Sequence, residues 1–117
     1  ARTIALSNAD EKFLDKLTET IKKNISEPEF NVDILASEMN MSRSNLHLKL
    51  KAITGESTID FIRKIRFNEA AKLLKDGRYT VAEVSAMVGF NTPSYFATSF
   101  KKYFGCLPIE YIKKVKG

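Results

Sequence analysis

A long internal repeat dominates this sequence. The segment VDILASEMNMSRSNLHLKLKAITG begins at Val32, and a similar segment, VAEVSAMVGFNTPSYFATSFKKYFG, begins at Val81. Matching positions lie 49 residues apart in the first part of each segment and 50 apart afterwards, so the second copy carries one inserted residue. The clearest pairs are Val32 with Val81, Asn40 with Gly89, Leu46 with Phe96, Leu50 with Phe100 and Gly55 with Gly105. A repeat of this length predicts two stacked copies of one supersecondary unit.

Each copy has the pattern of two short helices joined by a turn. The first copy opens with apolar residues at i, i+3, i+4 and i+7 over residues 32–39, which is the stripe of an amphipathic helix. Asn40 and Gly89 follow this helix in the two copies, and both residue types tolerate the left-handed backbone that often ends a helix. Ser42 and Thr92 then provide hydroxyl caps for a second helix, and a proline follows Thr92. This pattern predicts a helix-turn-helix in each copy.

The remaining segments also have helical periodicity, and none alternates with the period of a strand over strand length. We therefore predict an all-α fold of about seven helices, in which two helix-turn-helix subdomains are joined by a long linker helix. The predicted helices span residues 10–25, 32–39, 43–53, 58–75, 81–88, 93–104 and 108–115. The predicted domains are a flexible N-terminal tail (1–9), a first helix-turn-helix subdomain (10–56), the linker helix (57–77) and a second helix-turn-helix subdomain (78–117).

The linker helix determines how far apart the two units lie. At about 1.5 Å per residue, its 18 predicted residues span about 27 Å. With the width of the flanking units added, the second helices of the two copies can lie about 34 Å apart, which is one turn of B-DNA. Both could then enter the major groove on one face of a duplex, and a monomer would read an asymmetric site.

Positive charge is concentrated in the repeats. The chain carries a net charge of +5, and residues 31–117 hold 14 basic and 8 acidic side chains, a net of +6. A basic surface of this kind releases counterions from a phosphate backbone. Ordinary solubilising charge is the alternative interpretation. However, the positive charge coincides with the two helix-turn-helix patterns, and this coincidence favours nucleic-acid binding.

Other classes of protein lack support in the sequence. No apolar run approaches the length of about 18 residues that a membrane span needs, and nothing resembles a secretory signal, so we expect a soluble, cytoplasmic chain without membrane contact. His47 is the only histidine and has no ligand partners at metal-binding spacing, so we predict no metal site and no cofactor. With no Gly-rich phosphate loop, nucleophile with a paired base or carboxylate dyad, we predict that it is not an enzyme.

Three segments together carry a family resemblance. SRSNLHLKLKAITG, FIRKIRFNEAAKLL and above all GFNTPSYFATSFKKYFGCLPIEY resemble the DNA-binding domain of AraC/XylS-type transcription regulators, over residues 13–114. The resemblance implies sequence-specific binding to double-stranded promoter DNA, usually with activation of transcription through contact with RNA polymerase. The opening DEKFLDKLTETIKKNISEPEFNV resembles the segment that precedes this domain in bacterial hybrid two-component sensors. That implies a sensor or receiver part in a longer chain.

The resemblance also assigns base-reading positions. Carried over residue by residue, they fall on Ser44, Asn45, His47, Leu48, Pro93, Ser94, Ala97 and Thr98. Relatives often have arginine at the positions of Leu48 and Thr98, where its fork on guanine gives about 1–3 kcal/mol of discrimination. Leu48 and Thr98 cannot make that contact, although either can touch a thymine methyl. We therefore expect weaker affinity or a preference shifted away from guanine.

Cationic side chains and helix N-termini near the second helices suit DNA phosphates. The predicted phosphate contacts are Ser42, Arg43, Lys49, Lys51, Arg63, Thr92, Lys101 and Lys102. A solvated surface is the alternative for each lysine. The linker cations Arg63, Lys64 and Arg66 could equally pair with Asp60, Glu69 or a carbonyl in the hinge between the units. The side chains assigned to the core are Leu46, Leu50, Phe96, Phe100, Phe104, Tyr111 and Ile112.

Two residues and two classes of function stay open. Tyr95 could reach DNA, although an aromatic side chain on so short a helix more often packs against its neighbours. For His47 we favour contact with DNA over a place in the core. A helical protein-protein interaction module without DNA binding would explain the repeat but not the basic second helices. An RNA-binding role would use the same charge, yet the motifs suit the DNA major groove better.

Overall fold

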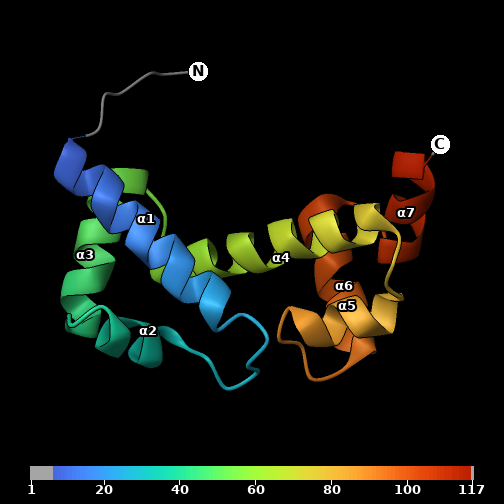
Figure 1. Cartoon of the computed structure of the whole chain (residues 1–117), viewed down its shortest axis with the longest axis horizontal. Helices are drawn as coiled ribbons and strands as arrows, with labels where there is room; N and C mark the ends of the chain where they lie inside the picture. Colours follow the sequence, from blue (N-terminus) through green and yellow to red (C-terminus); the bar gives the residue numbers. More distant parts are fainter. Residues whose placement is uncertain (1–6, 117) are drawn as a thin grey trace.

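The computed structural model describes residues 7–116 of the chain, and the elements within them are all helices. One long helix, α4, crosses the molecule, and three shorter helices gather at each of its ends (Figure 1). The all-α prediction is therefore confirmed, with seven helices in this part of the chain. Their bounds are α1 (Asn8–Lys23), α2 (Val32–Glu38), α3 (Arg43–Thr54), α4 (Thr58–Asp76), α5 (Val81–Met87), α6 (Pro93–Phe104) and α7 (Pro108–Lys116). We call α1–α3 the first unit and α5–α7 the second unit.

The largest difference from the predicted helix bounds is at α1, which begins and ends two residues earlier than expected. Ser7 is its N-cap, because the Ser7 hydroxyl accepts the N–H of Asp10 at 3.1 Å. At the other end, the N–H of the C-cap Asn24 turns back to the Ile21 carbonyl at 3.1 Å. The predicted flexible tail (1–9) therefore extends too far, and residues 1–6 of it lie outside the described residues.

The turns inside the two units have the same backbone geometry. Asn40 and Gly89 are both left-handed, with φ of 56° and 85°, as the repeat predicted. In the first turn the N–H of Met41 donates to the Ala36 carbonyl at 2.9 Å, and the equivalent bond of the second turn ends on the Ser85 carbonyl at 3.0 Å. These bonds satisfy carbonyls that the end of a helix would otherwise leave unpaired.

The second helices of the two units, α3 and α6, also begin and end alike. Each has 12 residues, and the hydroxyls of Ser42 and Thr92 cap their N-termini. Each ends at a left-handed glycine, Gly55 or Gly105, whose N–H closes the last turn. The repeat in the sequence is thus a repeat of caps, turns and helix lengths.

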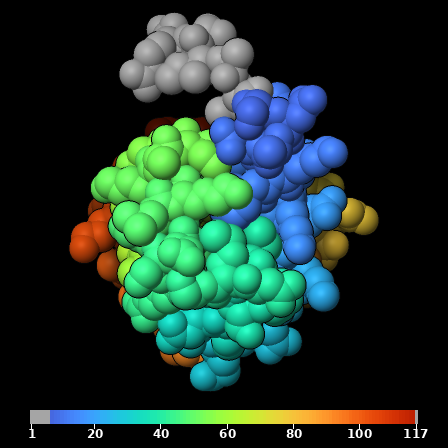
Figure 2. Space-filling model, turned by 90° about the vertical axis from the view of Figure 1, so that its left-hand side faces the viewer, coloured from blue at the N-terminus to red at the C-terminus, as the bar shows by residue number. Residues whose placement is uncertain are grey.

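Two separate clusters of buried side chains hold the two ends of the molecule together. The first joins α1, α2 and α3, which form one continuous surface at that end (Figure 2), and the second joins α5 and α6. Successive turns of α4 belong to different clusters. It contributes Phe61, Ile62 and Ile65 to the first and Phe67, Ala70 and Leu74 to the second. α4 is therefore part of both cores and not a spacer between them.

The predicted core was correct at four of its seven positions. Four side chains are fully buried, namely Leu46, Leu50, Phe96 and Phe100. Three others pack against the second cluster but remain partly exposed, namely Phe104, Tyr111 and Ile112. Tyr111 and Ile112 lie on α7, which packs on α4 and α6 from one side and leaves its other side to solvent. These residues therefore form the edge of the core.

The side chain of Arg66 ties the two units together. Its Nη1 donates to the carbonyl of Val88 in the second turn at 2.8 Å and to the carbonyl of Ile25, after α1, at 3.4 Å. Gly89 lies against this contact, and a Cβ there would overlap both the Arg66 guanidinium and the Ile25 carbonyl. A second bridge joins Lys22 of α1 to Glu69 of α4 at 3.3 Å. We call Arg66 with these two carbonyls the junction.

Candidate nucleic-acid interface

The predicted base-reading residues of α3 lie mainly on its outer face. Leu46 and Leu50 hold the helix against the first cluster, and this turns Ser44, Asn45 and Leu48 toward solvent. Leu48 is 65% exposed, although its side chain is large and apolar. His47 is only partly exposed, because it lies closer to the buried face of the helix.

The outer face of α6 differs from that of α3 in chemistry. Pro93, Ser94 and Thr98 are exposed, and Ala97 is partly exposed. The hydroxyl of Thr98 donates to the Ser94 carbonyl at 3.0 Å within the helix. The hydroxyl proton of Thr98 is therefore already engaged, and its oxygen can still accept a hydrogen bond.

Tyr95 lies on the same outer face and is 65% exposed. Its ring packs at one edge against Phe90, with the ring centroids 5.6 Å apart. The packing favoured for an aromatic side chain here is therefore present at Phe90, and most of the Tyr95 side chain nevertheless stays exposed. The sequence signal for this exposure was the spacing of i, i+3 from Thr98, which places both residues on one face of a helix.

The predicted phosphate-contact residues fall into two groups. Lys51, Lys101 and Lys102 are exposed and form no ion pair within residues 7–116. The other cations already have neighbours. These are Arg43 with Asp33 at 3.4 Å, Arg63 with Asp60 at 3.2 Å, and Lys49 with the Phe13 ring at 4.5 Å.

Ion pairing also divides the linker cations. Lys64 pairs with Glu56 at 2.6 Å, and only Arg66 bonds to carbonyls of the hinge. Exposed pairs such as Arg43 with Asp33 contribute little and exchange readily for a phosphate partner. Lys49 is different, since its ammonium is directed at α1 and away from the outer face of α3.

The N-termini of α3 and α6 differ in charge from those of the other described helices. The first turns of α1, α2, α4, α5 and α7 each hold an acidic residue, whereas those of α3 and α6 hold none. The positive end of a helix dipole attracts anions, and an acidic residue in the first turn neutralises it. The two helices that carry the predicted base-reading residues therefore keep their N-termini available for phosphates.

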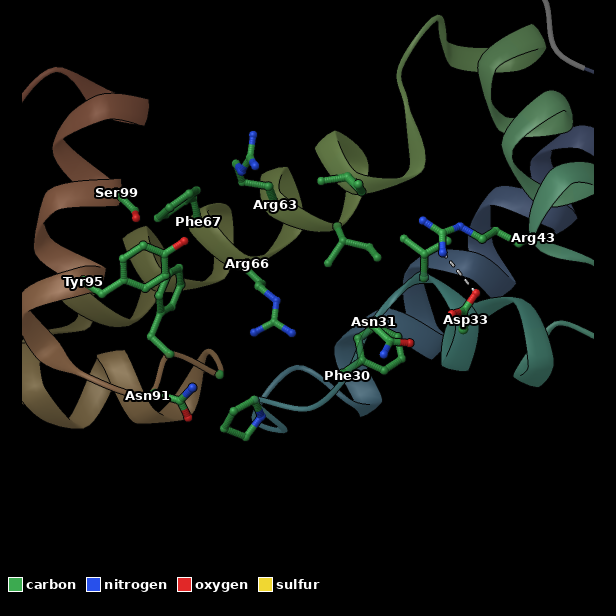
Figure 3. Close-up of a pocket in the computed structure, with 16 residues that line it drawn as sticks. Phe30, Asn31, Asp33, Arg43, Arg63, Arg66, Phe67, Asn91, Tyr95 and Ser99 are labelled. Atoms are coloured by element: carbon green, nitrogen blue, oxygen red, sulfur yellow. Dashed lines mark hydrogen bonds and ion pairs between the residues drawn. The ribbon is translucent and has the colours of Figure 1, made fainter.

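A hollow of about 490 Å³ lies between the two units (Figure 3). Its borders include Arg43 in the first turn of α3, Tyr95 and Ser99 on α6, and Arg63 and Arg66 on α4. Both second helices thus approach one hollow from opposite sides. Burial lowers the pKa of Arg66, because desolvation penalises its charged form, although a guanidinium stays protonated at neutral pH.

Two other properties of the described residues bear on the kind of site present. Within residues 7–116 no three histidine, cysteine or carboxylate side chains gather closely enough to hold a metal ion. None of the described helices is both long enough and apolar enough to span a bilayer.

Comparison with known proteins relates this geometry to a family. Residues 35–114 match a family profile described as a helix-turn-helix domain. The chain is 34% identical over 108 residues to histidine kinase P4 of Formosa agariphila, which covers 92% of the chain and 8% of that protein. It is 33% identical over 106 residues to the transcriptional activator AggR of Escherichia coli, which covers 89% of the chain and 38% of that protein.

A solved structure agrees with these matches. The DNA-binding domain of the transcriptional factor AdpA, in complex with a target DNA, has a TM-score of 0.76 and 26% identity, and the match covers 86% of this chain and 90% of that one. The helix-turn-helix prediction is confirmed, and these matches do not favour an interaction module without DNA binding. The chain is a helix-turn-helix domain, and it spans only 8% and 38% of the two curated relatives named above.

Proposed function

The chain belongs to the AraC/XylS-type family of helix-turn-helix domains, and we propose that it binds specific sequences in double-stranded DNA and regulates transcription. In this proposal α3 and α6 enter adjacent segments of the major groove on one face of the duplex, and the domain acts as an activator. The observation that carries the proposal is the pair of matched second helices with N-termini free of acidic residues. The similarity to the AdpA domain, which was solved in complex with a target DNA, supports DNA binding by this fold.

The two helices would read different bases. On α3 the proposed readers are Ser44, Asn45, His47 and Leu48, and on α6 they are Pro93, Ser94, Ala97 and Thr98. The small polar side chains can donate to or accept from base edges, and the apolar ones suit thymine methyl groups. Because the two sets differ, we propose an asymmetric site bound by a monomer. The 19 residues of α4 span about 28 Å, which supports two readers about one helical turn apart.

Phosphate contacts would position the readers. The cations proposed for this role are Arg43, Lys49, Lys51, Arg63, Lys101 and Lys102, together with the helix N-termini at Ser42 and Thr92. Lys51, Lys101 and Lys102 have the strongest support, because they are exposed and unpaired within the described part of the chain. Lys49 has the weakest, because it would have to leave the Phe13 ring.

Selection from a random duplex library tests this function directly. We expect one asymmetric consensus with two conserved stretches about one helical turn apart. Affinity for the selected duplex should fall steeply with salt, by about 10³-fold or more between 50 and 200 mM, if six or more phosphates are neutralised. A scrambled duplex of the same composition is the control. Equal affinity for the selected and scrambled duplexes would exclude specific recognition.

Arginine at positions 48 and 98, where this chain lacks the arginine that relatives often have, should strengthen DNA recognition. We expect Leu48→Arg and Thr98→Arg together to give a consensus enriched in guanine and an affinity at least about 30-fold tighter, since two good pairs at about 1–3 kcal/mol each give about 2 kcal/mol or more. Ile109→Arg on α7 is the control, because Ile109 is 54% exposed and lies outside both reading helices. After fresh selection for each variant, affinities are compared at one salt concentration. An equal gain in the control would attribute the effect to added charge alone.

The family and the kinase match suggest two partners beyond DNA. We propose that the domain contacts RNA polymerase when it activates transcription. We also propose that it is the output part of a longer chain with a sensor or receiver, which the match to a small share of histidine kinase P4 supports. Such an output domain would act in the cytoplasm, where the DNA lies.

A further inference from the structure

The hollow between the two units has the size and the walls of a small-molecule site. Its volume of about 490 Å³ falls within the range of about 300–1,000 Å³ typical of ligand pockets. Aromatic residues from four parts of the fold border it, namely Phe30 before α2, Phe67 on α4, Phe90 in the second turn and Tyr95 on α6. Phe30 and Phe67 are buried, so the rings that offer exposed surface are those of Phe90 and Tyr95. Most of the surface that these residues and Ile59 offer is apolar.

The charged groups of the hollow are unbalanced. Three arginines line it, Arg43, Arg63 and Arg66, and its single acidic residue, Asp33, already pairs with Arg43. Arg66 reaches into the middle of the hollow, between Tyr95 and Phe30 (Figure 3). Its two hydrogen bonds both use Nη1, and it pairs with no carboxylate among the described residues. The remaining N–H groups of a half-buried guanidinium are therefore available to an anion.

We propose that this hollow binds a small aromatic anion, an aryl carboxylate or sulfonate, whose ring packs on the aromatic walls and whose anionic group pairs with Arg66. A planar guanidinium suits such a group, because it can donate two parallel hydrogen bonds to its oxygens. Since Val88 and Ile25 fix one edge of Arg66, the site is largely formed before the ligand arrives. That lowers the entropic cost of binding.

The ligand would also weaken DNA binding, a consequence that rests on the proposed function. Arg43 and Arg63 line the hollow and are proposed phosphate contacts, so a bound anion offsets the charge that attracts the duplex. By thermodynamic linkage, DNA must weaken ligand binding by the same factor. The hollow would then make DNA binding sensitive to a metabolite with this chemistry.

The fluorescent sulfonate 8-anilinonaphthalene-1-sulfonate is a suitable probe, and its uncharged analogue N-phenyl-1-naphthylamine isolates the contribution of the anionic group. We expect saturable binding of one sulfonate per folded chain, and at least 10-fold weaker binding of the neutral analogue. Ile59→Glu places a carboxylate at the rim of the hollow and should weaken the sulfonate about 10-fold, through about 1.4 kcal/mol of repulsion. Ile109→Glu should have no effect, since Ile59 and Ile109 are equally exposed, at 53% and 54%, and only Ile59 lines the hollow.

Thermal unfolding of both variants checks that each is folded. Equal sulfonate binding by Ile59→Glu and Ile109→Glu, or equal binding of the charged and neutral probes, would overturn the site.

In a second arm, saturating sulfonate should weaken binding of the selected duplex to the wild type several-fold, and should have less effect on Ile59→Glu. No effect on the wild type would overturn the coupling to DNA. A chain that binds the probe normally but no duplex would overturn the proposed function and leave the site standing.

Discussion

Replacing Gly89 with alanine should destabilise the protein far more than replacing Gly105 with alanine. Both glycines are left-handed, with φ of 85° and 84°, so the backbone strain of the new side chain is the same, about 1–2 kcal/mol. A Cβ at position 105 meets nothing within 4 Å, whereas a Cβ at position 89 overlaps the Arg66 guanidinium and the Ile25 carbonyl. Gly89→Ala must therefore displace Arg66, whose charged hydrogen bonds contribute about 1.5–3 kcal/mol each.

Denaturant unfolding measures both losses. We expect Gly105→Ala to lower the free energy of unfolding by about 1–2 kcal/mol and Gly89→Ala to lower it by about 3 kcal/mol or more. A double-mutant cycle tests the cause. If Gly89→Ala acts by displacing Arg66, then Arg66→Met should cost much less in the Gly89→Ala background than in the wild type. Additive losses, or equal losses for the two glycines, would show that the junction contributes little.

Removing the ring of Phe67 should produce a loss of similar size in the second core. Phe67 is 1% exposed, and its ring contacts those of Phe90, Phe100, Tyr103 and Phe104 at centroid distances of 4.9–6.3 Å. We expect Phe67→Ala to lower the free energy of unfolding by about 3–5 kcal/mol, because truncating a buried ring leaves a cavity that the surroundings fill only partly.

Tyr103→Ala provides the matched comparison. Tyr103 stacks on the same ring, with centroids 4.9 Å apart, but is 41% exposed. Its truncation leaves a surface notch that water fills, so we expect a loss of about 1 kcal/mol. Urea unfolding of the two variants, followed by circular dichroism, gives both values. Similar losses for Phe67→Ala and Tyr103→Ala would mean that aromatic contact, and not burial, stabilises this end of α4.

Local features were predictable from the sequence because they depend on neighbouring residues. The left-handed turns at Asn40 and Gly89 follow from the requirements of a helix end, and the caps at Ser42 and Thr92 follow from hydroxyl chemistry. The start of α1 was missed by two residues, because Ser7, Asn8 and Asp10 are all residue types that cap helices and only Ser7 takes the role.

Contacts between distant parts of the chain were not predictable in the same way. Arg66 and Ile25 are separated by 41 residues, and periodicity carries no information about such a pair. The sequence allowed a linker cation to bind a carbonyl in the hinge between the units. It could not say which of the three cations would form that hydrogen bond. The turning of Lys49 toward Phe13 likewise depends on how whole helices pack.

In the proposed binding mode, in which the domain contacts two stretches of duplex at once, the junction has a further consequence. A single guanidinium holds the loop after α1 and the turn before α6, so these hydrogen bonds fix the distance between the two units. Each base pair added between two half-sites moves one of them by about 3.4 Å and rotates it by about 35°. A domain with this fixed geometry would discriminate between half-site spacings, and the length of the spacer would be as much a part of the recognised sequence as the bases themselves.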